Sequence, residues 1–218
     1  MRVGILGGTG PAGRALAARL AAADVNVVIG SRSVERATST CEEIRQRWPE
    51  HPMWLEPAEN HDAAEAQLVV VATPWEAAGP TTESVADVVA GKVVVSMANA
   101  LEKKDGELHA VTPPSGSVAA AVQEAAPDAL VAAAFHHVPA RAMAAVDTPI
   151  DGDVIVCTDH QAAFDATAEL VRMIPDLRPI HGGSLASAAP VEAFTAVLLG
   201  VNLRYKARAV VRLNGIPE

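Results

Sequence analysis

The segment Gly7-Gly8-Thr9-Gly10-Pro11-Ala12-Gly13 constrains the fold more than any other part of this sequence. It holds the pattern G-x-G-x-x-G, with Gly8, Gly10 and Gly13 as the spaced glycines, between an apolar run and an alanine-rich stretch. Such a strand, turn and helix open a βαβ unit in which the missing side chains let the backbone approach a pyrophosphate. Free N–H groups at the helix start face the negative charge. The segment therefore predicts a dinucleotide site.

The rest of the chain alternates short apolar runs with longer alanine-rich and charged segments. The predicted strands are Arg2–Leu6, Asn26–Ile29, Leu68–Ala72, Lys92–Ser96, Leu130–Ala134 and Asp153–Cys157. The predicted helices are Pro11–Ala23, Val34–Trp48, Thr81–Val89, Ser115–Ala125, Ala162–Met173 and Pro190–Leu213, with Ser33 as the expected N-cap of the second. Most of the strand runs are continuous Val, Ile and Leu, which is typical of parallel strands buried on both faces. The pattern predicts an α/β fold with a Rossmann-type doubly wound parallel sheet.

The regular alternation ends near residue 138, and several prolines follow. We therefore predict an NADP-binding Rossmann domain over residues 1–145 and a small C-terminal α/β domain over residues 146–218. The second part is too short for another nucleotide fold, so we expect it to pack against the first and to offer a dimer surface. The long apolar last helix makes a homodimer the expected state.

The residues after the second predicted strand indicate which nucleotide is bound. NAD-binding relatives of this fold place a carboxylate there to hold the ribose 2′-hydroxyl. Here the segment reads Gly30-Ser31-Arg32-Ser33, and Arg36 follows on the same helix face as Arg32. A hydroxyl and two guanidinium groups attract the 2′-phosphate of NADP, whereas a carboxylate would repel it. Ser31, Arg32 and Arg36 are therefore predicted to select NADP(H).

Other polar residues follow buried strands, where open α/β sheets bind their ligands. Thr73 and Pro74 come after the third predicted strand and Asn99 after the fourth, so they are candidates for the ribose and nicotinamide side of the cofactor. His136 follows the fifth strand, and it either contacts a ligand or is satisfied by nearby backbone. The neighbouring His137 points the other way in an extended segment, so we give it no role.

Composition excludes several other classes of protein. The formal net charge is −9, which disfavours nucleic acid and anionic membrane surfaces. Two cysteines give no disulfide framework, and no group of residues has metal-ligand spacing, so we expect a cytoplasmic protein with no metal site. The run Val191–Leu203 is broken by Glu192 and Thr195 and is shorter than a membrane span of about 20 apolar residues.

Several segments also share their order and spacing with one family of redox enzymes. The segments are Gly7-Gly8-Thr9-Gly10, Ser31-Arg32, Thr73-Pro74-Trp75-Glu76, His136-His137-Val138-Pro139-Ala140, Leu177-Arg178-Pro179, Gly183-Ser184-Leu185 and Val191-Glu192. In these residues the chain resembles the NADPH-dependent reductases of the deazaflavin coenzyme F420. The resemblance implies a reversible hydride transfer between NADP(H) and coenzyme F420, in a homodimer with a Rossmann domain and a small C-terminal domain.

The resemblance also implies roles for single residues. Thr9, Gly10, Pro11 and Ala12 would hold the pyrophosphate, and Thr73, Asn99 and Ala140 would lie along the nicotinamide half. His136 and Val138 would contact the deazaflavin ring, with Val211 approaching it from the last helix. Because the two cofactors carry the chemistry, no catalytic acid or base is expected.

Three questions stay open at this level. The acceptor of the hydride could instead be ferric iron, a flavin or an imine, and a non-catalytic NADP(H)-sensing protein could carry the same glycine turn. Arg204, Arg208 and Arg212 recur every four residues on the predicted last helix, and they either receive an acidic ligand or complement the helix dipole. The charged segment Glu102-Lys103-Lys104-Asp105 is expected to be a loop of unassigned role.

Overall fold

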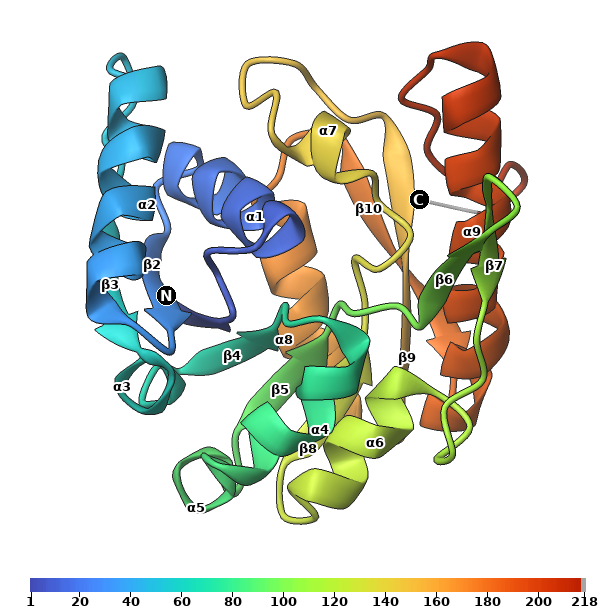
Figure 1. The fold of residues 1–218 in the computed structure, drawn as a ribbon, viewed down its shortest axis with the longest axis horizontal. Coiled ribbons are helices and arrows are strands. Elements are labelled where there is room, and N and C mark those ends of the chain that lie inside the picture. Colours follow the sequence, from blue (N-terminus) through green and yellow to red (C-terminus); the bar gives the residue numbers. More distant parts are fainter. Residues whose placement is uncertain (217–218) are drawn as a thin grey trace.

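A central sheet of eight strands organises the protein, as Figure 1 shows for the computed structural model, which describes residues 1–216. The strand order is β10-β9-β8-β5-β4-β1-β2-β3, and every neighbouring pair is parallel except β8 and β9. The strands are β1 Arg2–Leu6, β2 Asn26–Ser31, β3 Leu55–Glu59, β4 Leu68–Val71, β5 Val93–Ser96, β8 Leu130–Ala133, β9 Gly152–Thr158 and β10 Leu177–Gly183. The predicted doubly wound parallel sheet is thereby confirmed.

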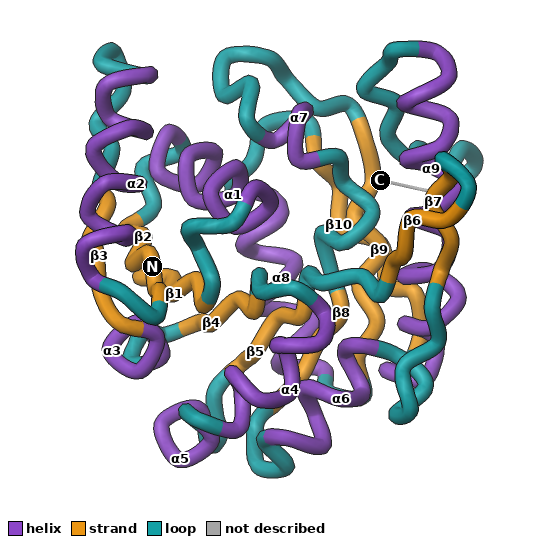
Figure 2. Tube along the Cα trace, in the orientation of Figure 1, coloured by secondary structure: helices purple, strands orange, loops and turns teal. Residues whose placement is uncertain are grey.

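Helices cover both faces of this sheet (Figure 2). One apolar cluster lies between the sheet and α1, α2, α7 and α8, and a second lies between the sheet and α3 to α6. The helices are α1 Pro11–Ala22, α2 Val34–Arg47, α3 Asn60–Ala64, α4 Trp75–Glu83, α5 Ala86–Val89, α6 Val118–Ala125, α7 Ala140–Met143, α8 Gln161–Arg172 and α9 Ala188–Tyr205. A short 3-10 turn, Leu185–Ser187, leads into α9. The small side chains of α1 let it lie close to the strands beneath it.

The strands that sequence reasoning missed lie at the edges of the main sheet or outside it. Edge strands β3 and β10 contain Pro57 and Pro179, and a proline inside an apolar run argues against a strand unless that strand is an edge. The charged segment 102–105, expected as a loop, belongs to a hairpin of β6 Leu101–Lys104 and β7 Glu107–Ala110. Asp105 and Gly106 form its turn with φ of 52° and 85°, which is the backbone that an Asp-Gly hairpin turn requires.

Two predicted helices had the wrong limits. The helix expected over 81–89 is instead α4, which begins at Trp75, followed by the short α5. The last helix ends at Tyr205, because Lys206 adopts a left-handed φ of 51° that caps the helix. Residues 207–216 are therefore not helical, and Arg208 and Arg212 do not share a helix face with Arg204. The prediction of one arginine stripe was wrong.

The C-terminal part continues the same sheet. Strand β9 pairs antiparallel with β8, and β10 pairs with β9. The buried carboxylate of Asp153 accepts hydrogen bonds from the Arg178 guanidinium and from the Leu213 backbone N–H, which fixes the segment after α9 against the sheet. The division into domains at residue 145 stays a prediction, and the sheet crosses it without a break.

The apolar helical segment near the C-terminus is longer than the run considered in the sequence. Leu185–Tyr205 is long and apolar enough to cross a membrane by length and composition alone, with a mean hydropathy of 1.4 over its most apolar window. The earlier exclusion of a span on length was therefore too strict. In the fold this segment packs beside the hairpin, as Figure 1 shows for α9 and β7, and its Glu192 carboxylate accepts hydrogen bonds from the backbone N–H groups of Val118 and Ala119 at the start of α6.

Candidate functional site

The site is built where the winding of the sheet reverses. The chain runs from β1 outward to β2 and β3, and then returns to place β4 on the other side of β1. The carboxyl ends of β1 and β4 therefore leave a crevice between the segments that follow them. The first turn of α1 and the segment after β4 are so close that a Cβ on Gly13 would lie 2.9 Å from the Ala72 Cβ. Glycine at this position lets helix α1 start directly over the strands.

The glycine turn is held by backbone hydrogen bonds and leaves donors unused. Gly7 has a φ of 70°, and its N–H donates to the Asn60 side-chain oxygen at 3.2 Å. Gly8 N–H donates to the Gly30 carbonyl and Gly10 N–H to the Gly7 carbonyl, which closes the turn. The backbone N–H of Arg14 donates the first hydrogen bond of helix α1, to the Gly10 carbonyl. Among residues 1–216, the N–H groups of the first turn before Arg14 have no such partner, and free N–H groups at a helix start suit an anion.

The residues predicted to hold a 2′-phosphate gather at the end of β2. Ser31 is buried, and its hydroxyl accepts a hydrogen bond from the Ser33 N–H. Ser33 caps α2 by accepting from the Arg36 N–H at 3.2 Å, which confirms the predicted cap. Arg32 and Arg36 are both exposed, and neither forms an ion pair with any residue of the described part of the chain. Two guanidinium groups without a carboxylate partner suit an anion.

Two adjoining cavities follow at the ends of β4, β5 and β8. The first has a volume of about 360 Å³ and the second about 160 Å³, and both are lined by Ala12, Met97 and Asn99, so they share a wall. Ala72, Thr73, Pro74, Trp75, Glu76, Ala98 and Leu101 complete the first cavity. Phe135, His136, His137, Val138, Pro139, Ala140, Thr195, Leu198 and Leu199 complete the second. The structure therefore brings together predicted residues from four separate parts of the sequence.

Buried polar atoms around these cavities lack protein partners. Thr73 Oγ1, Asn99 Oδ1 and both ring nitrogens of His136 are buried without a hydrogen bond among the residues the structure describes. The Asn99 amide nitrogen donates to the His136 carbonyl at 2.8 Å, which fixes both residues and leaves the Asn99 oxygen unpaired. Buried polar atoms normally have partners, so an unpaired set beside a cavity is expected where a polar ligand binds.

Both histidines behind the second cavity are neutral. Burial, and then the neighbouring His137 ring, lower the pKa of His136 to about 3. Burial likewise lowers the pKa of His137 to about 4. His137 Nε2 accepts a hydrogen bond from the Ile155 N–H at 3.0 Å, which directs this ring toward β9. Residues 136 and 137 lie in a turn after β8, so the extended segment expected from the sequence was wrong. His136 can thus offer hydrogen bonds to a ligand but no charge.

The structure corrects one wall of the site. Val211 was expected on the last helix, but it lies in the segment after α9, where its carbonyl accepts from the Asp153 N–H, and it lines neither cavity. The wall that sequence reasoning missed comes from Thr195, Leu198 and Leu199 of α9. Thr195 donates a long hydrogen bond of 3.4 Å to the His136 carbonyl. The polar interruptions of an otherwise apolar helix were the available signal for this inward face.

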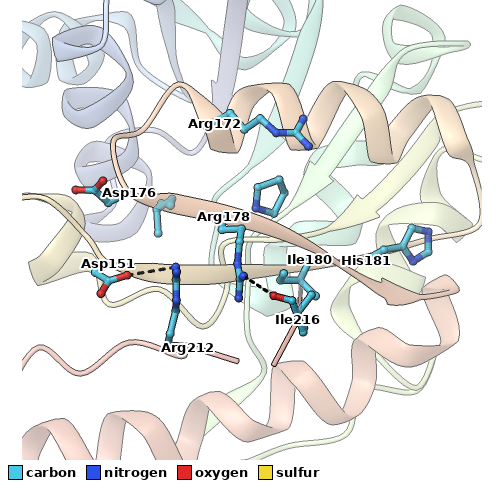
Figure 3. A pocket seen from close by; sticks show the side chains of 10 residues that line it. Asp151, Arg172, Asp176, Arg178, Ile180, His181, Arg212 and Ile216 are labelled. Carbon is cyan, nitrogen blue, oxygen red and sulfur yellow. Dashed lines mark hydrogen bonds and ion pairs between the residues drawn. The ribbon is translucent and has the colours of Figure 1, made fainter. Parts of the chain in front are cut away.

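A larger cavity lies elsewhere, beside β10, with about 930 Å³ (Figure 3). Two of its charged side chains are engaged within the protein: Arg212 reaches Asp151, and Arg178 binds the Asp153 carboxylate and the Ile216 carbonyl. It shares no residue with the two cavities at the strand ends. A groove that contains no residue of the glycine turn or of the segments after β4, β5 and β8 is a weaker candidate for a cofactor site.

Comparisons with known proteins agree with this geometry. Residues 2–100 match the model of the family described as NADP oxidoreductase, coenzyme F420-dependent. The F420-dependent NADP reductase of Methanothermobacter thermautotrophicus is 34% identical, covering 100% of this chain and 97% of that one. The protein of the same name from Methanothermobacter marburgensis is 32% identical over the full length of both chains.

A solved structure also superimposes on the whole molecule. The protein of Arthrobacter sp. FB24 has a TM-score of 0.82 at 26% identity and covers 100% of both chains. The shared fold, the glycine turn and the full-length relatives are mutually consistent. The chain therefore belongs to the coenzyme F420-dependent NADP oxidoreductase family.

Proposed function

We propose that this protein transfers a hydride reversibly between NADP(H) and coenzyme F420. The observation that carries the proposal is the pair of adjoining cavities, which share a wall beside the dinucleotide turn. Two flat rings that exchange a hydride must lie face to face in a site that excludes water. Neighbouring cavities of mostly apolar lining, with a few unpaired polar atoms, suit two such rings. The cofactors supply the redox chemistry, so the protein needs no acid or base of its own.

The proposed roles follow the path of the crevice. Ser31, Arg32 and Arg36 bind the 2′-phosphate, since a hydroxyl and two unpaired guanidinium groups lie at the end of β2. Asn99 orients the nicotinamide side through its unpaired oxygen. The turn residues Gly8, Thr9, Gly10, Pro11, Ala12 and Gly13 hold the pyrophosphate, Thr73, Pro74 and Ala140 line the nicotinamide half, and His136 and Val138 contact the deazaflavin. Val211 stands outside this set.

The proposal is tested by mixing the purified protein with NADPH and oxidised coenzyme F420 and following the visible absorption band of the deazaflavin. Loss of the band, faster with NADPH than with NADH, is the expected result. A protein that binds NADPH but leaves the band intact would not be a deazaflavin reductase. Ferric iron, a flavin and an imine would then be tried as acceptors, and the absence of any turnover would indicate an NADP(H) sensor.

Replacing Arg32 with Ala is expected to weaken NADPH binding about ten- to hundred-fold and to leave NADH binding nearly unchanged. A hydrogen bond to a charged group contributes about 1.5–3 kcal/mol, and only NADPH carries the 2′-phosphate. Fluorescence titration with each nucleotide measures both affinities. Arg47→Ala, in the last turn of α2, the helix that begins two residues after Arg32, is the matched control and should change neither affinity. Equal losses for NADPH and NADH in Arg32→Ala would place the phosphate elsewhere.

We also propose that the protein is a cytoplasmic homodimer that buries the outer face of α9. Phe194, Val197 and Leu203 on this helix are 43%, 58% and 63% exposed, which is unusual for large apolar side chains clustered on one element. Light scattering on the purified protein should give twice the mass of the chain, 22.5 kDa. Val197→Glu should then give the single mass, and a wild-type monomer would refute the proposed dimer.

A further inference from the structure

Arg19 of α1 is a fully engaged arginine in the interior of the protein. The residue is only 2% exposed. Its own helix contains no acidic residue that could neutralise the buried charge. Its guanidinium donates five hydrogen bonds of 2.6–3.0 Å, all to backbone carbonyls. The acceptors are the carbonyl oxygens of Ala142, Met143, Ala145, Val146 and Thr148. Every N–H of the side chain is therefore used on a single short segment.

That segment continues directly from a wall of the second cavity. Residues 135–140 line the cavity, and α7 and the residues after it, which Arg19 binds, follow in the chain. The opposite wall includes Ala12, which lies seven residues before Arg19 and hence on the same face of α1. Helix α1 thus lines the cavity with Ala12 in its first turn. Two turns later, its Arg19 binds the segment that continues from the other wall.

The hydrogen bonds between the Arg19 guanidinium and residues 142–148 require a fixed geometry of that segment. Burial lowers the pKa of Arg19, so the charge costs free energy to keep inside, and carbonyl dipoles surround it in place of a hydrogen-bonded carboxylate. A planar guanidinium presents its donors in a rigid fork, so five carbonyls can be satisfied only when the segment adopts one arrangement. A lysine has three donors around one nitrogen and cannot hold the same set.

We propose that Arg19 is a positioning residue for hydride transfer, which it assists by fixing the distance between the two walls of the second cavity. The inference rests on the proposed function. By tying residues 142–148 to the helix that begins at the dinucleotide turn, Arg19 sets the place of residues 136–140 relative to that turn. Hydride transfer depends steeply on the separation of the reacting atoms, and nucleotide affinity does not.

The test compares Arg19→Lys with Arg45→Lys in the full-length protein. Arg45 also donates from its guanidinium to a backbone carbonyl, that of Leu55, but on α2 and far along the sheet from both cavities. Three quantities are measured for each variant: the turnover number with NADPH and F420 per folded molecule, the NADPH dissociation constant without acceptor, and amide hydrogen exchange over residues 136–148 without any cofactor. The lysine keeps the charge and most of the stem, and turnover is counted per folded molecule, so a loss of stability alone does not lower it.

We expect Arg19→Lys to lower the turnover number at least ten-fold, to change the NADPH dissociation constant less than two-fold, and to speed exchange over 142–148. Arg45→Lys should change none of the three. Unchanged exchange, unchanged turnover with faster exchange, or a turnover loss matched by lost NADPH affinity would each overturn the inference. A wild-type protein that binds NADPH but leaves F420 unreduced would refute the proposed function itself, and the role in hydride transfer would fall with it.

Discussion

Gly4→Ala is expected to destabilise the protein by about 4 kcal/mol or more, which is at the upper end of what single substitutions do. Gly4 lies in β1, with β2 on one side and β4 on the other. A Cβ at this position would lie 1.9 Å from the Ala63 carbonyl oxygen and 2.8 Å from its carbon. A central strand cannot shift to relieve such an overlap, and the obstacle is backbone, so α3 would have to move away from the sheet.

The same substitution should weaken NADPH binding, because α3 supports the phosphate turn. Asn60 begins α3, and its side-chain oxygen accepts the hydrogen bond from the Gly7 N–H. A displaced α3 removes this bond from the residue that starts the turn. Urea unfolding followed by circular dichroism measures the stability loss, and NADPH titration of the remaining folded protein measures the effect on the turn.

Gly200→Ala provides the matched control for a glycine replaced in a regular element. Gly200 lies inside α9, and a Cβ there would meet nothing within 4 Å. Because alanine is the better helix former by about 1 kcal/mol, this variant should be as stable as the wild type or slightly more stable. If Gly4→Ala unfolded at the same urea concentration as Gly200→Ala, the close packing of α3 on β1 would not contribute measurably to the stability of the protein.

Sequence reasoning predicted the parts of this fold that depend on local pattern. The central strands are continuous runs of Val and Ile, and such runs have few alternatives to a buried parallel strand. The cap at Ser33 and the start of α1 at Pro11 follow from the chemistry of a helix N-terminus. The candidate site residues at strand ends were predictable for the same reason, since the carboxyl ends of parallel strands share one edge of the sheet.

The parts that could not be predicted depend on contacts between distant segments. No feature of the sequence around Arg19 indicates that five carbonyls more than 120 residues away would surround it. The end of α9 was missed because Lys206, and no glycine, takes the left-handed conformation there. The inward side of α9 was missed because the helix is apolar on nearly all sides, and its only signal was the two polar interruptions, Glu192 and Thr195. The hairpin, in contrast, had a usable signal in its Asp-Gly turn.

Acid is expected to destabilise the protein between about pH 6.5 and pH 4, through the two buried histidines behind the second cavity. The pKa of His136 is lowered to about 3 and that of His137 to about 4, mainly by burial. In this window the unfolded chain binds protons at both histidines and the folded protein does not, so stability is complete above the unfolded value of about 6.5 and falls with the pH. Each histidine contributes a slope of about 1.4 kcal/mol per pH unit, so the pair costs about 4 kcal/mol between pH 6.5 and pH 5.

His137→Gln separates the two contributions. The glutamine oxygen can take the place of the ring Nε2 as acceptor for the Ile155 N–H, so the hydrogen bond is kept and the titration is lost. Urea unfolding at pH 7.5, 6.5, 5.5 and 4.5, without cofactor, should show the variant losing stability with about half the wild-type slope below pH 6.5. The measurement is a difference at each pH, because burial raises the pKa of Glu192 and gives a stability change of the opposite sign in both proteins.

Equal losses of stability in the wild type and in His137→Gln at every pH would mean that His137 accepts a proton without unfolding the protein. That result would contradict the burial of His137, and it would require water or a neighbouring anion to reach the ring. A neutral His136 at every pH where the protein is folded has a consequence for binding: the residue can present one N–H and one lone pair to a flat ring, but it cannot attract an anion. The positive charge for recognition would then come from Arg32 and Arg36, at the other end of the nucleotide.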